Sequence, residues 1–158
     1  MANLSTSALK STRDFTNVLD SFQNYASIQT VAATGAVTVA DDTAILAMTV
    51  DGAMVPTMPA ARPGRHVKAC WIVEQATNDR VFTCAGSDTF AGNIFTSVAG
   101  NSAGDGDVVA VAATTVTITC VDDVNIGSYL DFYCYTDGVW FVTGHLVVDA
   151  VGNVPTLA

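Results

Sequence analysis

Short segments of β-branched and small apolar residues, separated by turn residues about every ten positions, run along most of this chain. From Val31 onward, threonine, valine and alanine dominate the segments, and glycine, asparagine, aspartate and proline separate them. Residues of the first kind favour strands, and residues of the second kind favour turns. Many short strands at this spacing are typical of a sandwich or a barrel. The sequence therefore predicts an all-β fold, a jelly-roll-like β-sandwich or a barrel.

The segments that fit a strand can be placed along the chain. They are Ala36–Val39, Thr43–Val50, Ala53–Met58, Arg65–Glu74, Arg80–Ala85, Val108–Ala113, Thr115–Val121, Ser128–Tyr135 and Val139–Val148. The run Gly100–Asp107 is rich in glycine, asparagine and aspartate, which predicts a long loop.

The N-terminal segment differs from the rest of the chain. Its apolar residues recur at three- and four-residue steps: Phe15, Val18, Leu19, Phe22 and Tyr25. That periodicity predicts a helix over Thr12–Ala26. The alternative is an extended arm whose aromatic side chains bind a neighbouring subunit. We therefore divide the chain into an N-terminal helix or arm, residues 1–30, and a β-sandwich domain, residues 31–158.

The composition constrains the partners of the chain. Half of the residues are hydrophobic and only 13% are charged, whereas about 25% of an average globular domain is charged. No stretch approaches the ~20 apolar residues of a membrane helix, and no secretion signal opens the sequence. We expect a protein that folds in a cytoplasm and covers apolar surface with other subunits. The net charge of −9 disfavours nucleic acid and does not suggest a membrane partner.

The cysteines, Cys70, Cys84, Cys120 and Cys134, form no C-x-x-C pair and have no histidine at a ligand spacing. In a reducing cytoplasm such residues are expected to be free thiols within apolar strands. A disulfide or a metal site is the alternative.

The clearest local signal is the turn Asp137-Gly138 between two strand segments. Both central residues of a type I′ hairpin turn need a positive φ, which this dipeptide tolerates. The turn pairs Tyr135 with Trp140 and sets the register outward from there. One face of the hairpin then carries Tyr129, Asp131, Tyr133, Tyr135, Trp140 and Leu146, and the other carries Leu130, Phe132, Cys134 and Phe141. Because both faces are apolar or aromatic, we expect the first to form an oligomer interface, with Asp131 finding a partner there.

Candidate catalytic residues are few. The histidines His66 and His145 lie in no nucleophile motif, and the carboxylates are nearly all aspartates in predicted turns. There is no P-loop and no G-x-G-x-x-G motif. The residues Asn101, Asp105 and Asp107 offer oxygen ligands but lack the spacing of an EF-hand. We therefore expect no enzyme activity, no cofactor and no metal.

Basic residues cluster once, at Arg62, Arg65 and Lys68 around Pro63-Gly64. They form either a solvated turn or an electropositive patch on an acidic protein. A patch of this sign suits docking on an acidic partner surface.

Several turn-and-strand phrases occur in an order that resembles a known group of proteins. The phrases are Gly35-Ala36-Val37-Thr38-Val39, Val55-Pro56-Thr57-Met58-Pro59, Pro63-Gly64, Ala85-Gly86-Ser87-Asp88-Thr89-Phe90-Ala91-Gly92, Asn125-Ile126-Gly127-Ser128-Tyr129-Leu130 and Thr136-Asp137-Gly138-Val139-Trp140-Phe141-Val142-Thr143-Gly144. Between Val31 and Val147 the chain resembles the small trimeric head decoration, or cement, proteins of tailed phages.

The resemblance implies a homotrimer that binds the major capsid protein and stabilises the shell. The virion surface is then its location, after assembly in the host cytoplasm. Expected docking residues are Phe15, Phe22, Tyr25, Arg62, Arg65 and Lys68. The alternatives are a trimeric tail-fibre or receptor-binding module and, third, a lectin-like or carbohydrate-active domain that uses Trp71 or Trp140 beside paired aspartates.

Overall fold

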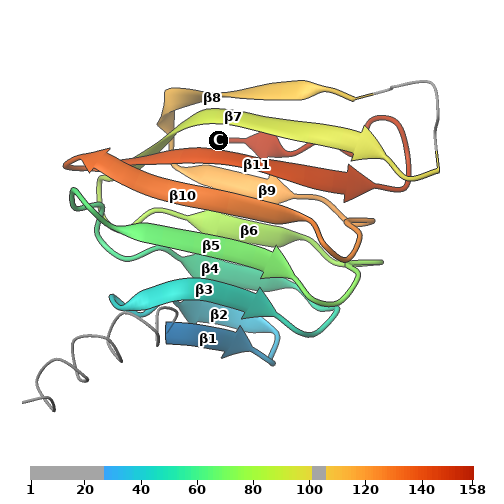
Figure 1. Ribbon diagram of the computed structural model, residues 1–158, viewed down its shortest axis with the longest axis horizontal. Helices are drawn as coiled ribbons and strands as arrows, with labels where there is room; N and C mark the ends of the chain where they lie inside the picture. Colours follow the sequence, from blue (N-terminus) through green and yellow to red (C-terminus); the bar gives the residue numbers. More distant parts are fainter. Residues whose placement is uncertain (1–26, 101–105) are drawn as a thin grey trace, which may run out of the picture.

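The computed structural model describes residues 27–100 and 106–158, and within them the chain forms two stacked β-sheets and no helix (Figure 1). The all-β sandwich expected from the sequence is confirmed. The predicted helix or arm over Thr12–Ala26 lies outside the described residues, as does part of the predicted loop Gly100–Asp107. In the described part of the chain, no helix is long and apolar enough to cross a membrane.

The strands divide unequally between the two layers. In spatial order the larger sheet contains β1 (Ser27–Val31), β3 (Thr43–Met48), β5 (His66–Trp71), β10 (Tyr129–Thr136), β11 (Val139–Val148), β7 (Thr89–Val98) and β8 (Val108–Thr115). The smaller sheet contains β12 (Thr156–Leu157), β9 (Thr117–Cys120), β6 (Arg80–Thr83), β4 (Met54–Thr57) and β2 (Gly35–Thr38). Because β1 begins at Ser27, the sandwich includes residues that the sequence analysis assigned to the N-terminal segment.

The first six strands wind between the two sheets as a flattened coil. In the larger sheet β1 pairs in parallel with β3 and β3 with β5, while β2, β4 and β6 pair in parallel in the smaller sheet. Parallel neighbours need a crossover connection, and each crossover here passes through a strand of the opposite sheet (Figure 1). Jelly rolls are antiparallel, so this half of the molecule has a connectivity that the sequence did not predict.

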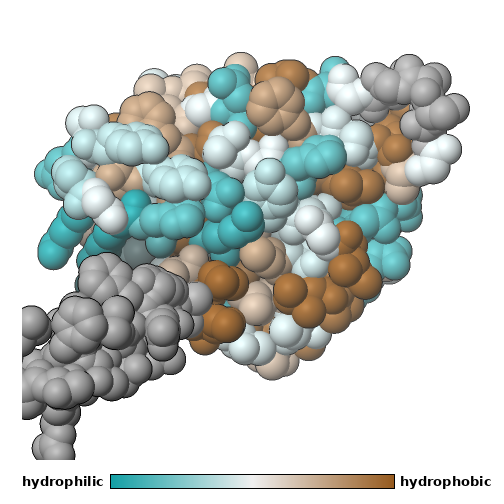
Figure 2. Space-filling model, viewed as in Figure 1, coloured by the Kyte–Doolittle hydropathy of each residue, from teal (hydrophilic) through white to brown (hydrophobic). Residues whose placement is uncertain are grey.

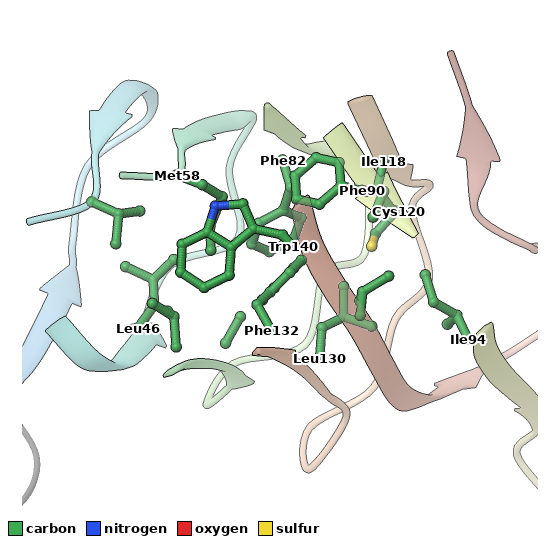
Figure 3. Close-up of a cluster of buried hydrophobic side chains, with 14 of the residues drawn as sticks. Leu46, Met58, Phe82, Phe90, Ile94, Ile118, Cys120, Leu130, Phe132 and Trp140 are labelled. Carbon is green, nitrogen blue, oxygen red and sulfur yellow. The ribbon is translucent and has the colours of Figure 1, made fainter. Parts of the chain in front are cut away.

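The second half is mainly antiparallel and completes both sheets. The hairpin β10–β11 pairs with β5, and β9 pairs with β6. One parallel pair remains, between β7 and β11. The core lies between the layers, where Phe132 contacts Phe82 and Phe90 at ring-centroid distances of 5.3 and 5.7 Å (Figure 3).

The hairpin β10–β11 shows why one sequence prediction fails. Thr136 pairs with Val139, as the turn requires, but a bulge between Tyr133 and Thr136 makes Tyr133 pair with Phe141. A shift of one residue sends side chains to the opposite face of a sheet. Phe141 therefore points outward, and Trp140 and Leu146 point into the core, with 0% and 1% of their surface exposed. The prediction that Trp140 and Leu146 form an oligomer interface is wrong.

Both core tryptophans have a partner for the indole N–H. Trp140 donates to the carbonyl of Pro59 at 3.1 Å, and Trp71 donates to the side chain of Gln75 at 2.9 Å. A buried indole needs such an acceptor. Since Trp71 is only 1% exposed, neither tryptophan can serve as the exposed platform that the third alternative, a lectin-like or carbohydrate-active domain, would use.

Candidate functional site

The outer face of the larger sheet carries three rows of side chains in register across the strands. The first row is His66, Tyr133, Phe141 and Ala91. The second is Ile28, Ile45, Lys68, Asp131, Thr143, Asn93 and Ala110. The third is Thr30, Ala47, Cys70, Tyr129, His145, Phe95 and Val108. Directly opposite residues in such rows are close neighbours.

This face is divided by polarity. Figure 2 shows hydrophobic atoms gathered at the lower right, over the carboxyl ends of β3 and β5, and hydrophilic atoms at the left, over the opposite ends of the strands. The rows therefore carry surfaces of different chemistry rather than one uniform face.

A charge cluster lies at the centre of the face, around Asp131. One carboxylate oxygen lies 3.6 Å from the ammonium of Lys68, and the other lies 3.2 Å from Nε2 of His66. Asp131 is 9% exposed and has the partners that the sequence analysis expected of it. The Lys68 ammonium also lies 4.1 Å from the centre of the Tyr129 ring, a distance at which the ring quadrupole attracts a cation.

The predicted basic patch is partly neutralised within the chain. Arg65 lies 3.0 Å from the carboxylate of Asp41 and donates to the carbonyl of Ala60 at 2.7 Å. Lys68 is occupied by Asp131. Arg62 is exposed, and no ion pair of its own is found among the described residues. The three bases therefore do not act as one free positive surface.

An open groove of about 280 Å³ lies beside the charge cluster, and we call it the aromatic groove. Its lining residues are Gly92, Asn93, Phe95, Tyr133, Tyr135, Phe141, Val142 and Thr143. Three of the rings are well exposed, namely Tyr135 at 71%, Phe95 at 49% and Phe141 at 38%. Exposed aromatic residues that line one hollow mark a binding surface more strongly than isolated ones do.

The rings of one groove wall are held by stacking. Tyr133 stacks on His66 at 4.3 Å between ring centroids and on Tyr135 at 6.1 Å, with interplanar angles of 4° and 12°. Phe141 lies 5.7 Å from Tyr135 at an angle of 56°. Burial, and after it the carboxylate of Asp131, raise the pKa of Tyr133, so its phenol stays protonated at neutral pH. The wall is therefore uncharged and largely pre-ordered.

A second surface, which we call the isoleucine patch, consists of Ile72, which directly follows β5, and Ile126, which lies just before β10. Ile72 is 51% exposed and Ile126 is 64% exposed. The backbone of Trp71 bonds to Ser128 and Gly127 at 3.0 Å each, which brings the ends of the two segments side by side. Isoleucine is among the residues most often buried, so two exposed copies at one end of the sheet need an explanation.

The remaining reactive groups do not form a catalytic arrangement in the part of the chain described here. Nε2 of His145 bonds with the hydroxyl of Ser97 at 2.8 Å, but this pair does not line the aromatic groove. All four cysteines are free thiols, and burial raises the pKa of Cys84 and Cys120 to about 12, which keeps them unreactive. Within the described residues no group of three His, Cys, Asp or Glu could hold a metal ion.

The sequence analysis placed some of these site residues and missed others. Tyr129, Asp131, Tyr133 and Tyr135 lie on the outer face, but in separate features rather than one interface. The docking residues Phe15, Phe22 and Tyr25 lie outside the described residues. Asn93 and Phe95 were missed because β7 was not predicted. The alternation of Phe90, Ile94 and Thr96, all buried, is the signal that could have revealed that strand.

Comparison of the chain with protein-family models, curated proteins and solved structures finds no match.

Proposed function

We propose that the chain is a structural virion protein without catalytic activity, which decorates the capsid shell as a homotrimer joined through the isoleucine patch. The observation that carries the proposal is the exposure of Ile72 and Ile126 at the same end of the larger sheet. Leaving such a side chain in water forgoes roughly 1.5–3 kcal/mol. A neighbouring subunit that covers both residues recovers this free energy.

The charge distribution supports contact at this patch. The protein carries a net charge of −9, so two copies repel one another over most of their surface. Ile72 and Ile126 carry no charge, and the core of a protein interface is depleted of charged residues.

The resemblance to phage decoration proteins supports the assignment to a virion. A cement protein needs area and shape, not a reactive centre. An interface of about 800 Å² per partner is sufficient for specific association, and repeated sites on a shell add avidity. The capsid then presents the acidic sandwich as a layer on its surface.

The test measures the molar mass by light scattering over a range of concentrations. The wild-type protein is expected to have three times the 16.4 kDa of one chain. Ile72→Asp and Ile126→Asp are each expected to give monomers, because an unpaired charge in an interface is strongly unfavourable.

Val151→Asp serves as the matched control, since Val151 is 71% exposed but lies outside the patch. It should leave the trimer intact. A monomeric wild-type protein, or trimers that persist in both isoleucine variants, would contradict the proposal.

A further inference from the structure

We propose that the aromatic groove is a binding site for a neutral carbohydrate of one or two sugar rings. The groove combines two kinds of contact. Its walls are the exposed rings of Tyr135 and Phe141 on one side and Phe95 on the other. Its polar groups are Asn93 and Thr143, which pair directly across β7 and β11 and are both exposed.

A sugar ring matches this combination. The C–H groups on one face of a pyranose pack against aromatic rings, while its hydroxyls radiate from the edge and need hydrogen-bond partners. The amide of Asn93 offers two donor hydrogens and an acceptor, and the hydroxyl of Thr143 offers a donor and an acceptor. Within the described residues, neither side chain makes an intramolecular hydrogen bond, so both are available to a ligand.

The charge of the site indicates that the sugar is neutral. None of the described residues that line the groove is ionised at neutral pH. The nearby carboxylate, Asp131, is already paired with Lys68 and His66. The whole protein carries a net charge of −9, which repels sialylated and sulfated sugars and also nucleotides.

The size of the groove sets the size of the ligand. Its volume of about 280 Å³ is near the lower end of the range for small-molecule sites. At roughly 30 Å³ per water molecule, a groove of this volume holds about nine water molecules, which a bound ligand would displace. One sugar ring fits within this space, and a second can extend toward solvent because the groove is open.

Other occupants fit the groove less well. A purely apolar ligand would cover Asn93 and Thr143 without replacing their water hydrogen bonds, which is unfavourable. A peptide bound as an added strand needs a free sheet edge, whereas the groove lies over β10, β11 and β7, which are paired with one another.

The backbone holds the base of the groove in place. A Cβ atom added to Gly92 would lie 2.0 Å from the carbonyl oxygen of Val142, so only glycine allows β7 to approach β11 this closely. The stack of His66 on Tyr133 fixes the adjacent wall. A site that is ordered before binding loses less conformational entropy when the ligand arrives.

The test uses the labelled full-length protein on an array of immobilised neutral oligosaccharides with their sialylated and sulfated counterparts. Binding to neutral sugars is expected. The best-bound sugar is then titrated in solution against Tyr135→Ala and Asn93→Ala, with thermal unfolding measured to show that both variants are folded. We expect Tyr135→Ala to weaken binding about tenfold and Asn93→Ala about fivefold.

Ile28→Ala is the matched control, because Ile28 lies on the same sheet face and is 59% exposed but does not line the groove. Its affinity should stay within about twofold of the wild type. The proposal is overturned if no neutral sugar binds, if only anionic sugars bind, or if the groove variants bind as well as the control. The isoleucine patch is not part of the groove, so failure here leaves the trimer proposal standing.

Discussion

At the scale of single residues, Arg80 is the least expected feature of the core. Its side chain is 0% exposed, and Nη2 donates to the carbonyl of Val50 at 2.8 Å. Among the described residues, Nε and Nη1 have no partner, while the guanidinium lies 5.4 Å from the ring of Trp71. Burial lowers the pKa of Arg80 to about 10. A buried, incompletely paired charge of this kind costs stability.

We therefore expect Arg80→Met to raise the free energy of unfolding by about 1–3 kcal/mol, because methionine fills similar space without a charge. Urea denaturation measures the change. Arg62→Met, which replaces an exposed arginine that has no ion pair among the described residues, is the control and should change stability by less than about 1 kcal/mol. A marked loss of stability in Arg80→Met would show that the guanidinium is stabilising.

The same substitution changes the pH dependence of stability. Because the pKa of Arg80 is lowered to about 10 in the folded state, the unfolded chain binds more protons than the folded chain in the window above about pH 10. Stability then rises with pH in that window for this group. The difference in the free energy of unfolding between Arg80→Met and the wild type should therefore become smaller as the pH rises above about 10, which urea denaturation at several pH values measures.

At the scale of elements, the backbone of β11 lies unusually close to both of its neighbours, β7 and β10, at glycine positions. A Cβ atom on Gly92 of β7 would lie 2.0 Å from the carbonyl oxygen of Val142. A Cβ atom on Gly144 would lie 2.3 Å from the carbonyl oxygen of Tyr129 in β10. The positive φ of 138° at Gly92 adds a second reason for glycine there. These positions fix the spacing of the strands that carry the aromatic groove.

Gly92→Ala and Gly144→Ala are expected to lower the free energy of unfolding by about 3 kcal/mol or more, because rigid backbone atoms must move. Gly152→Ala is the control. Gly152 has a φ of 101° but nothing within 4 Å of an added Cβ, so it reports backbone strain alone. Its cost should be about 1–2 kcal/mol. Equal effects at all three positions, measured by thermal unfolding, would contradict the steric argument.

The residue pattern predicts some of these strands, such as β11, and misses others, such as β7. The alternation in Val139–Val148 and the Asp137-Gly138 turn are local signals, and that strand is observed with the predicted bounds. β7 was missed because Gly92 resembles a turn residue, although it serves a close approach between strands. The bulge before Thr136 has no sequence signal of its own, yet it decides which face carries Phe141 and Trp140.

The site was harder to predict than the strands. Tyr133 and Tyr135 face outward as expected, because they lie two residues apart on one strand. The groove also needs Asn93 and Phe95, whose position depends on the pairing of β7 with β11, about a third of the chain further along. Such parallel pairing follows from the global arrangement and not from local periodicity.

At the scale of the whole molecule, the proposed docking on an acidic shell would have to overcome the net charge of −9. The structure leaves Arg62 as the exposed member of the basic cluster, since Arg65 and Lys68 face carboxylates at 3.0 and 3.6 Å. Exposed charges are screened within about 10 Å at 0.1 M salt. Under the proposed function, charge is therefore expected to tune the rate of capsid encounter more than the affinity for the capsid.

We expect deletion of residues 1–26 to weaken binding to undecorated capsids by more than about tenfold, because that segment carries Phe15, Phe22 and Tyr25. The deletion ends before β1 so that the sheet stays complete. Arg62→Ser is the comparison. It should reduce binding by about threefold at most, and its binding should depend less on the salt concentration than that of the wild-type protein does. Cosedimentation measures both. Unchanged binding of the shortened protein would place the docking surface on the sandwich itself.

The winding of β1 to β6 also bears on how the protein is made. The coil ends in β5 and β6, and the strands that cover these two edges, β10 and β9, come from the second half of the chain. During translation the coil therefore leaves the ribosome with both layers open on one side, and strand edges of that kind recruit other nascent chains. Folding of the sandwich has to wait for the C-terminal half of the chain. The rate of translation and the binding of chaperones to the nascent chain therefore influence how much folded protein is obtained.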